Sequence, residues 1–182
     1  MGKILIGLAL VLLDFPLQLA GSRVLDLAPD ILGYLLILYS LRRFYGYSRK
    51  FFSAHRLATF AAIASGVVLV AQIFIGTNAM SFVFVLTGIA ELLLQVALMF
   101  TIAGGLQEME IDYSLTLHSK WLKLSALGVG VGIVLGYAGL LVPVLVTVGS
   151  LIWDVLQFAY LILFYFVWEA LKNWQPPEEE EE

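Results

Sequence analysis

Long apolar runs separated by short polar breaks set the limits on what this chain can fold into. Each run approaches the roughly 20 residues that a helix needs to cross a bilayer. The runs lie near residues 4–21, 28–44, 57–76, 80–106, 121–141 and 143–171. Only 13% of the 182 residues are charged, whereas a soluble domain carries about 25%. The sequence therefore predicts an all-α polytopic membrane bundle of about six transmembrane helices.

The second run is the weakest of the six. From Pro29 to Leu41 it reaches bilayer length only if Asp30 lies at the membrane surface. Pro29 suits the first turn of a helix, and a carboxylate beside it complements the helix dipole. We therefore expect a short second helix, either tilted or partly re-entrant.

Basic residues gather on one side of this predicted bundle. With six crossings, the following cations share that side and only Arg23 lies opposite: Lys3, Arg42, Arg43, Arg49, Lys50, Arg56, Lys120, Lys123 and Lys172. Because loops rich in lysine and arginine stay in the cytoplasm, both termini are predicted to be cytoplasmic. The expected location is a cell membrane, with the bacterial cytoplasmic membrane favoured.

The loop over residues 42–56 mixes these cations with five aromatic residues. Aromatic rings settle at the headgroup level and cations attract anionic lipid, so anionic headgroups are an expected partner of this loop. The same rule explains the charges without a nucleic acid, and none is predicted. Residues 1–174 are expected to form one transmembrane domain, followed by an acidic, disordered tail over 175–182.

Several catalytic and metal-binding classes lack their motifs in this chain. It has no cysteine, no HExxH, no nucleotide-binding glycine loop and no GxGD motif. His55 and His118 are two isolated histidines without matched spacing, so no metal site is predicted. We therefore predict neither an enzyme nor a cofactor.

Two of the runs carry small residues at four-residue spacing, which places the small residues of each run on one helix face. Such ridges let helix backbones approach closely within lipid. The residues are Gly128, Gly132 and Gly136 in the fifth run and Ala58, Ala62 and Gly66 in the third. We expect these helices to be interior or tightly paired; a dimer contact is left open.

Acidic residues occur inside three of the apolar runs, each with a glutamine on the same predicted face. The pairs are Asp14 with Gln18, Glu91 with Gln95, and Asp154 with Gln157. At about 1.5 Å of rise per residue, Glu91 and Asp154 lie about 16 Å deep and Asp14 about 10 Å deep. If the three faces converge, they form a polar ladder through much of the membrane.

A charged carboxylate at mid-bilayer costs about 2.5–3.5 kcal/mol, and no lysine or arginine is expected at that depth. Either some of the acids are protonated, or a cation or a water-filled cavity accompanies them. Pro16 adds a second feature, because it frees the carbonyl of Leu12 near Asp14. The plainer alternative is that acids and glutamines only bond the helices together.

The stretch LDLAPDILGYLLILYSLRRF, residues 25–44, resembles a PD-x-x-GY segment of small uncharacterised multi-pass membrane proteins of Gram-positive bacteria. This resemblance implies membrane residence and no particular activity.

Our leading hypothesis is a small integral membrane transport protein or transport subunit. Its midplane site would bind a proton, a cation or a small polar solute through Asp14, Glu91, Asp154, Gln18, Gln95 and Gln157. The helices could form an inverted three-helix repeat in which Asp14 corresponds to Glu91. The alternative is a non-transporting scaffold whose cytoplasmic loops dock another protein. A required partner or homo-oligomer is left open by the sequence.

Overall fold

The computed structural model describes the backbone of residues 1–13, 16–19, 23–26, 30–75, 81–139, 142–172 and 174. Side chains are described for residues 1–13, 30–70, 87–139, 142–172 and 174. The elements, in chain order, are α1 (Gly2–Leu12), β1 (Pro16–Leu19), β2 (Arg23–Asp26), α2 (Asp30–Leu41), the 3-10 helix η1 (Arg42–Phe44), α3 (Arg49–Ile75), α4 (Ser81–Asp112), α5 (Ser119–Ala138) and α6 (Val144–Lys172). The prediction of a helical bundle is confirmed.

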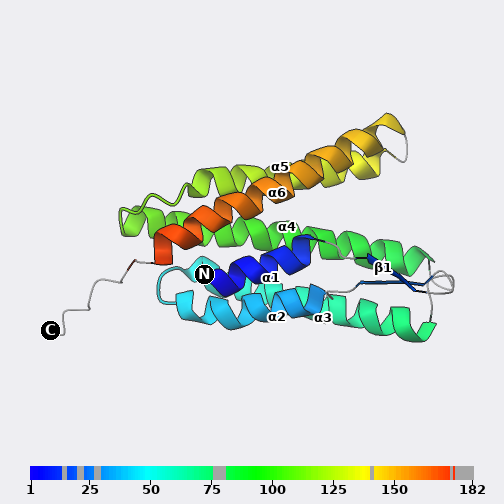
Figure 1. The fold of residues 1–182 in the computed structure, drawn as a ribbon, viewed down its shortest axis with the longest axis horizontal. Coiled ribbons are helices and arrows are strands. Elements are labelled where there is room, and N and C mark those ends of the chain that lie inside the picture. Colours follow the sequence, from blue (N-terminus) through cyan, green and yellow to red (C-terminus); the bar gives the residue numbers. More distant parts are fainter. Residues whose placement is uncertain are drawn as a thin grey trace.

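The helices run alternately in opposite directions, and each packs against the next one along the chain (Figure 1). α6 also packs against α1, which joins the last helix to the first. The N-terminus, η1, the α4–α5 connection and the C-terminal end of α6 lie at one end of the bundle, which we call the basic end (Figure 1). The α5–α6 pair tilts away from α4 toward the other end.

Four helices are long and apolar enough to cross a membrane, and they support a membrane protein. They cover Arg49–Val70, Thr87–Asp112, Ser119–Ala138 and Val144–Lys172. Their outward faces carry large exposed hydrophobic side chains, among them Ile63, Val134 and Leu151, each at least 60% exposed. Such faces suit contact with lipid tails, where apolar side chains need no cover.

The predicted first span over residues 4–21 is wrong, because the helix stops about halfway. α1 ends at Leu12, and Leu13 has extended backbone angles of φ −108° and ψ 102°. Residues 16–19 then pair antiparallel with 23–26 as a hairpin, with Pro16 opposite Asp26. Proline clashes with the carbonyl four residues earlier and disfavours a helical residue before it, which explains the end of α1.

α2 is short, as predicted, and shorter than the run near 28–44. Its 12 residues span about 18 Å, and η1 continues from its C-terminal end. α1 and α2 cross at Gly7 and Gly33, where a Cβ on either residue would lie 2.6 Å from the other's carbonyl oxygen. The sequence analysis did not single out this contact, since neither glycine belongs to a repeated spacing.

Glycines also bring α5 and α6 into backbone contact. A Cβ on Gly132 would lie 2.8 Å from the backbone nitrogen of Trp153, and a Cβ on Gly128 would overlap the side chain of Leu156. Gly136 has open space at its own Cβ position, but its nitrogen lies against Gly149 of α6. In α3, Ala58 and Ala62 are buried and Gly66 faces Ile31 of α2.

Replacing Gly149 with alanine is expected to destabilise the α5–α6 pair by about 1–3 kcal/mol, the usual cost of overpacking. The new methyl group would overlap the backbone nitrogen of Gly136 and lie 2.7 Å from the Gly132 carbonyl oxygen, and neither backbone atom can move alone. Gly136→Ala is the matched control, because nothing lies within 4 Å of its Cβ position. Thermal unfolding in detergent measures both; equal midpoints would contradict the close approach.

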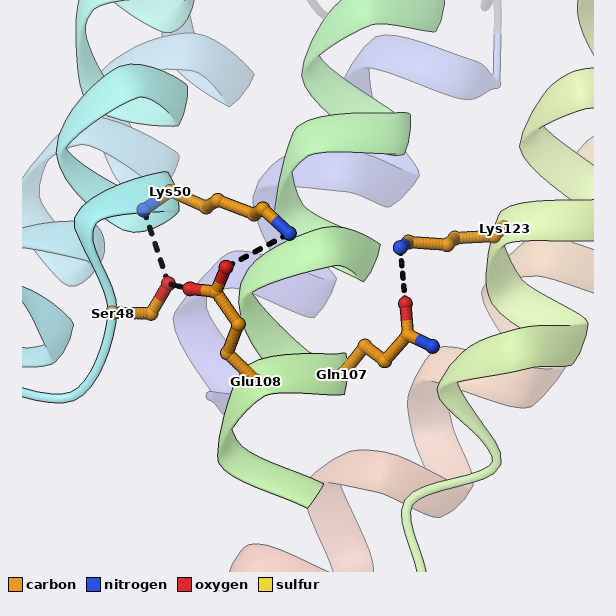
Figure 2. Close-up of polar contacts among 5 residues, drawn as sticks. All are labelled: Ser48, Lys50, Gln107, Glu108 and Lys123. Carbon is orange, nitrogen blue, oxygen red and sulfur yellow. Dashed lines mark hydrogen bonds and ion pairs between the residues drawn. The ribbon is translucent and has the colours of Figure 1, made fainter. Parts of the chain in front are cut away.

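Polar contacts tie the helices together at the basic end (Figure 2). Glu108 of α4 pairs with the Lys50 ammonium at 2.8 Å and accepts a hydrogen bond from the Ser48 hydroxyl. Ser48 also caps α3 by accepting from the Lys50 backbone N–H at 3.0 Å. Lys123 of α5 donates to Gln107, the residue before Glu108 (Figure 2). The acidic segment of α4 therefore bridges to the basic segment of α3.

Candidate functional site

A cavity of about 200 Å³ lies where the end of α1 and the start of α2 meet α4, α5 and α6. Its polar lining comes from one carboxylate of α2, one carboxylate and one amide of α4, and one amide of α6. The lining residues are Val11, Leu12, Asp30, Gly88, Glu91, Leu92, Gln95, Tyr137, Trp153 and Gln157. No lysine, arginine or histidine is among them.

Helix lengths place this cavity near the middle of the bundle. Counted at 1.5 Å per residue, Leu12 lies about 15 Å from the start of α1, and Asp30 about 16 Å from the end of α2. Glu91 lies about 15 Å from the start of α4, and Gln157 about 20 Å from the start of α6. In a hydrocarbon layer about 30 Å thick, these groups are far from both surfaces.

Gly88, Glu91 and Gln95 reach the cavity from one face of α4, because residues three and four apart lie above one another on a helix. Gln95 is only 6% exposed, and Glu91 is partly buried. Gly88 carries no side chain, and nothing lies within 4 Å of its Cβ position. The missing side chain at Gly88 leaves open space beside the Glu91 carboxylate.

Gln157 connects the cavity wall to the broken end of α1. With its amide nitrogen turned toward α1, it donates to the Leu12 carbonyl at 3.2 Å, and its oxygen accepts from the Trp153 indole N–H. The last carbonyls of a helix have no partner within that helix. Gln157, itself 6% exposed, therefore satisfies one of them at the point where α1 stops.

Asp30 begins α2 at the cavity, so its carboxylate lies at the positive end of the helix dipole. One turn further along, Tyr34 is fully buried, and the charges of Glu91 and Asp30 both act on its hydroxyl. Within the described part of the chain this hydroxyl has no hydrogen-bond partner. Asp30, Glu91 and Tyr34 are thus electrostatically linked across α2 and α4.

The structure brings together three of the six predicted site residues: Glu91, Gln95 and Gln157. Asp154 is exposed and does not line the cavity. Trp153, four residues before Gln157, lines the cavity from α6 instead. Asp14 and the side chain of Gln18 lie outside the described residues. A binding role for any of these residues stays a prediction.

Asp30 and Gly88 are cavity residues that the sequence analysis did not select. It placed Asp30 at the membrane surface, because it assumed that the second helix starts there. The sequence did carry a signal: Pro16 and Pro29 bracket a stretch with Gly21, Ser22 and one acid, Asp26, which is typical of non-helical chain. No sequence pattern distinguished Gly88, because whether a glycine leaves open space depends on which helix faces it.

The cavity can offer two carboxylates and two amides to a ligand, which are oxygen donors for a proton or a cation. Among the described side chains, no three histidine, aspartate or glutamate residues lie close enough together to hold a metal ion.

Comparison with family models, curated proteins and solved structures finds no match for this chain. The PD-x-x-GY resemblance therefore stays an expectation. The structure nevertheless gives three of its residues clear positions: Asp30 at the cavity, Gly33 at the crossing with α1, and Tyr34 in the core.

Proposed function

We propose that this protein is a small integral membrane transport protein or transport subunit whose site is the cavity lined by Asp30, Glu91, Gln95 and Gln157. One observation carries the proposal: α1 ends and α2 begins at the wall of a polar cavity inside the bundle. Secondary transporters bind ions and substrates at such interrupted helices near the bilayer midplane.

The charge of the cavity favours a proton or a cation over an anion. Among the described residues of its lining, the groups that carry charge near neutral pH are the carboxylates of Asp30 and Glu91. A buried carboxylate is stabilised when it is protonated or faces a positive charge. Gln95 and Gln157 add neutral oxygen donors, which can take over part of a hydration shell without adding charge.

The segments beyond the helix ends fit a water-accessible route to the cavity. α1 covers about 16 Å, and the four residues of β1 add about 13 Å, so helix and strand together match the bilayer thickness. A two-stranded hairpin leaves edge N–H and C=O groups unpaired within the sheet. At membrane depth such groups must be covered by protein or face water. We therefore place the outer entrance beside β1 and β2.

The basic end is proposed to face the cytoplasm, which follows from the positive-inside rule. On this orientation both termini are cytoplasmic, and the chain makes six passes, two of them part helix and part strand. An inverted three-helix repeat would pair α1 with α4, which have 11 and 32 residues. The unequal lengths give that repeat no support.

Glu91→Gln is expected to lower proton or monovalent-cation flux in reconstituted vesicles at least about tenfold. The change keeps the size of the side chain and removes the charge that a cation would neutralise. Flux is measured with a pH-sensitive dye inside vesicles under an imposed potassium gradient. Glu169→Gln is the matched control, because Glu169 is exposed on α6 and does not line the cavity.

Equal flux in Glu91→Gln and wild type would remove the proposed site. Two results together would favour the scaffold instead. Vesicles with the wild-type protein would conduct no more than protein-free vesicles, and a partner protein would co-purify through the loops of the basic end.

A further inference from the structure

A second cavity, of about 400 Å³, opens at the basic end, where η1 meets the C-terminal turn of α6. Two cationic side chains line it, Arg43 from η1 and Lys172 from α6, and Met1 with its α-amino group lies beside them. Aromatic side chains form much of the remaining wall: Phe44, Tyr47, Trp168 and Trp174. The volume lies within the range of cavities that hold small molecules. This cavity is separate from the one lined by Asp30 and Glu91, which we call the midplane cavity, and the two share no lining residue.

Among the residues that the structure describes, no acid in the lining balances the positive charge of this cavity. Among the described residues, the ion pair with a lysine or arginine is Lys50 with Glu108, and neither of these lines the cavity. The nearest acid in sequence, Glu169, lies on α6 and is exposed outside the lining. Arg43 and Lys172 therefore face the same space with no carboxylate between them.

The aromatic wall is held in place by edge-to-face contacts. Tyr47 lies 5.5 Å from Trp174, and Tyr113 lies 5.2 Å from Trp174, both measured between ring centroids. Trp168 packs over Gly2, where a Cβ would lie 3.1 Å from the indole nitrogen. Two indole N–H groups and a tyrosine hydroxyl thus belong to a fixed wall, where they can donate to an oxygen-rich anion.

We propose that this cavity binds a phosphate-bearing anion between the Arg43 guanidinium and the Lys172 ammonium. The planar guanidinium can donate two parallel hydrogen bonds to a phosphate, and lysine adds a point charge. Basic pockets between helices at the cytoplasmic surface suit anionic lipid headgroups, whose acyl chains would lie along the apolar helix faces. A soluble phosphate compound presents the same chemistry, and the experiment separates the two sources.

The test measures lipid binding to the purified full-length chain in an uncharged detergent by native mass spectrometry. Phosphatidylglycerol and phosphatidylcholine are titrated separately, and inorganic phosphate is titrated by calorimetry. We expect saturable binding of phosphatidylglycerol, at least about tenfold tighter than that of phosphatidylcholine. Removing two cations near the surface is expected to weaken binding about thirtyfold, so Arg43→Gln/Lys172→Gln should abolish the preference.

Arg42→Gln/Lys120→Gln is the matched control, because it removes the same two charges from exposed residues that do not line the cavity. It should keep the affinity for phosphatidylglycerol within about twofold. Equal losses in the two double variants would show attraction to general surface charge and overturn the proposal.

The phosphate titration distinguishes the sources. Saturable phosphate binding that needs Arg43 and Lys172, without a preference among lipids, would identify a soluble ligand for the same cavity. Binding of neither phosphatidylglycerol nor phosphate would overturn the site. Because all of these readouts are binding measurements, they succeed or fail independently of the transport proposal.

Discussion

Replacing Gly88 with phenylalanine is expected to abolish flux through the protein while leaving its fold intact. Gly88 lines the midplane cavity, and nothing lies within 4 Å of its Cβ position. A benzyl group can therefore enter this space of about 200 Å³ without displacing backbone. It would cover the approach to Glu91, one turn further along the same face of α4.

Gly88→Ala is the control for this prediction. A methyl group leaves most of the cavity open, so flux should stay within about twofold of wild type. Alanine in place of a helical glycine should also raise stability by about 0.5–1 kcal/mol, because the unfolded chain loses less entropy on folding. The two variants are compared by thermal unfolding and by dye-loaded vesicles.

Gly88→Phe tests whether the transported species passes through the cavity, which Glu91→Gln cannot test alone. A charge change at Glu91 alters both binding and the local field, whereas Gly88→Phe adds no charge. Normal flux in Gly88→Phe, with a normal unfolding midpoint, would mean that the transported species does not pass through this cavity. The protein would then still transport, but the site lined by Glu91 would have to be given up.

Local periodicity was enough to place two of the cavity residues on one helix face. Glu91 and Gln95 are four residues apart on one long helix, and such spacing fixes a shared face without knowledge of the neighbours. Gln157 was likewise placed inward. Asp154 and Gln157 are three residues apart on α6, and of the two Gln157 lines the cavity. Which of the two faces inward depends on where α1 and α4 lie, and a single sequence does not contain that information.

The path of the first two segments was the larger error. The apolar composition near residues 4–21 suits a transmembrane helix, and hydropathy alone gives no reason to stop at Leu12. Pro16 was recognised as a residue that breaks a helical hydrogen bond. A proline inside an apolar run can either kink the helix or end it, and the sequence analysis assumed that the helix continues. The structure has the second outcome, with residues 16–19 and 23–26 paired as strands. Asp30 therefore lies at the cavity inside the bundle and not at the predicted surface.

Replacing Gly33 with valine is expected to destabilise the protein by more than about 3 kcal/mol, beyond the usual cost of overpacking. A Cβ at Gly33 would lie 2.6 Å from the Gly7 carbonyl oxygen and 2.6 Å from a methyl group of Val11. The backbone oxygen cannot rotate away, so α2 must move off α1. Gly88→Ala again provides the control, since it adds a methyl group to a helical glycine that has open space.

The position of Gly33 links this loss of stability to function. It lies three residues after Asp30 on α2, and Val11, which it contacts, lines the midplane cavity with Leu12. A displaced α2 would carry Asp30 away from Glu91 and expose the end of α1 that Gln157 satisfies. The milder variant Gly33→Ala should therefore lose flux even at temperatures where it remains folded. If Gly33→Ala matched wild type in both unfolding midpoint and flux, the close crossing of α1 and α2 could not be what positions Asp30 at the cavity.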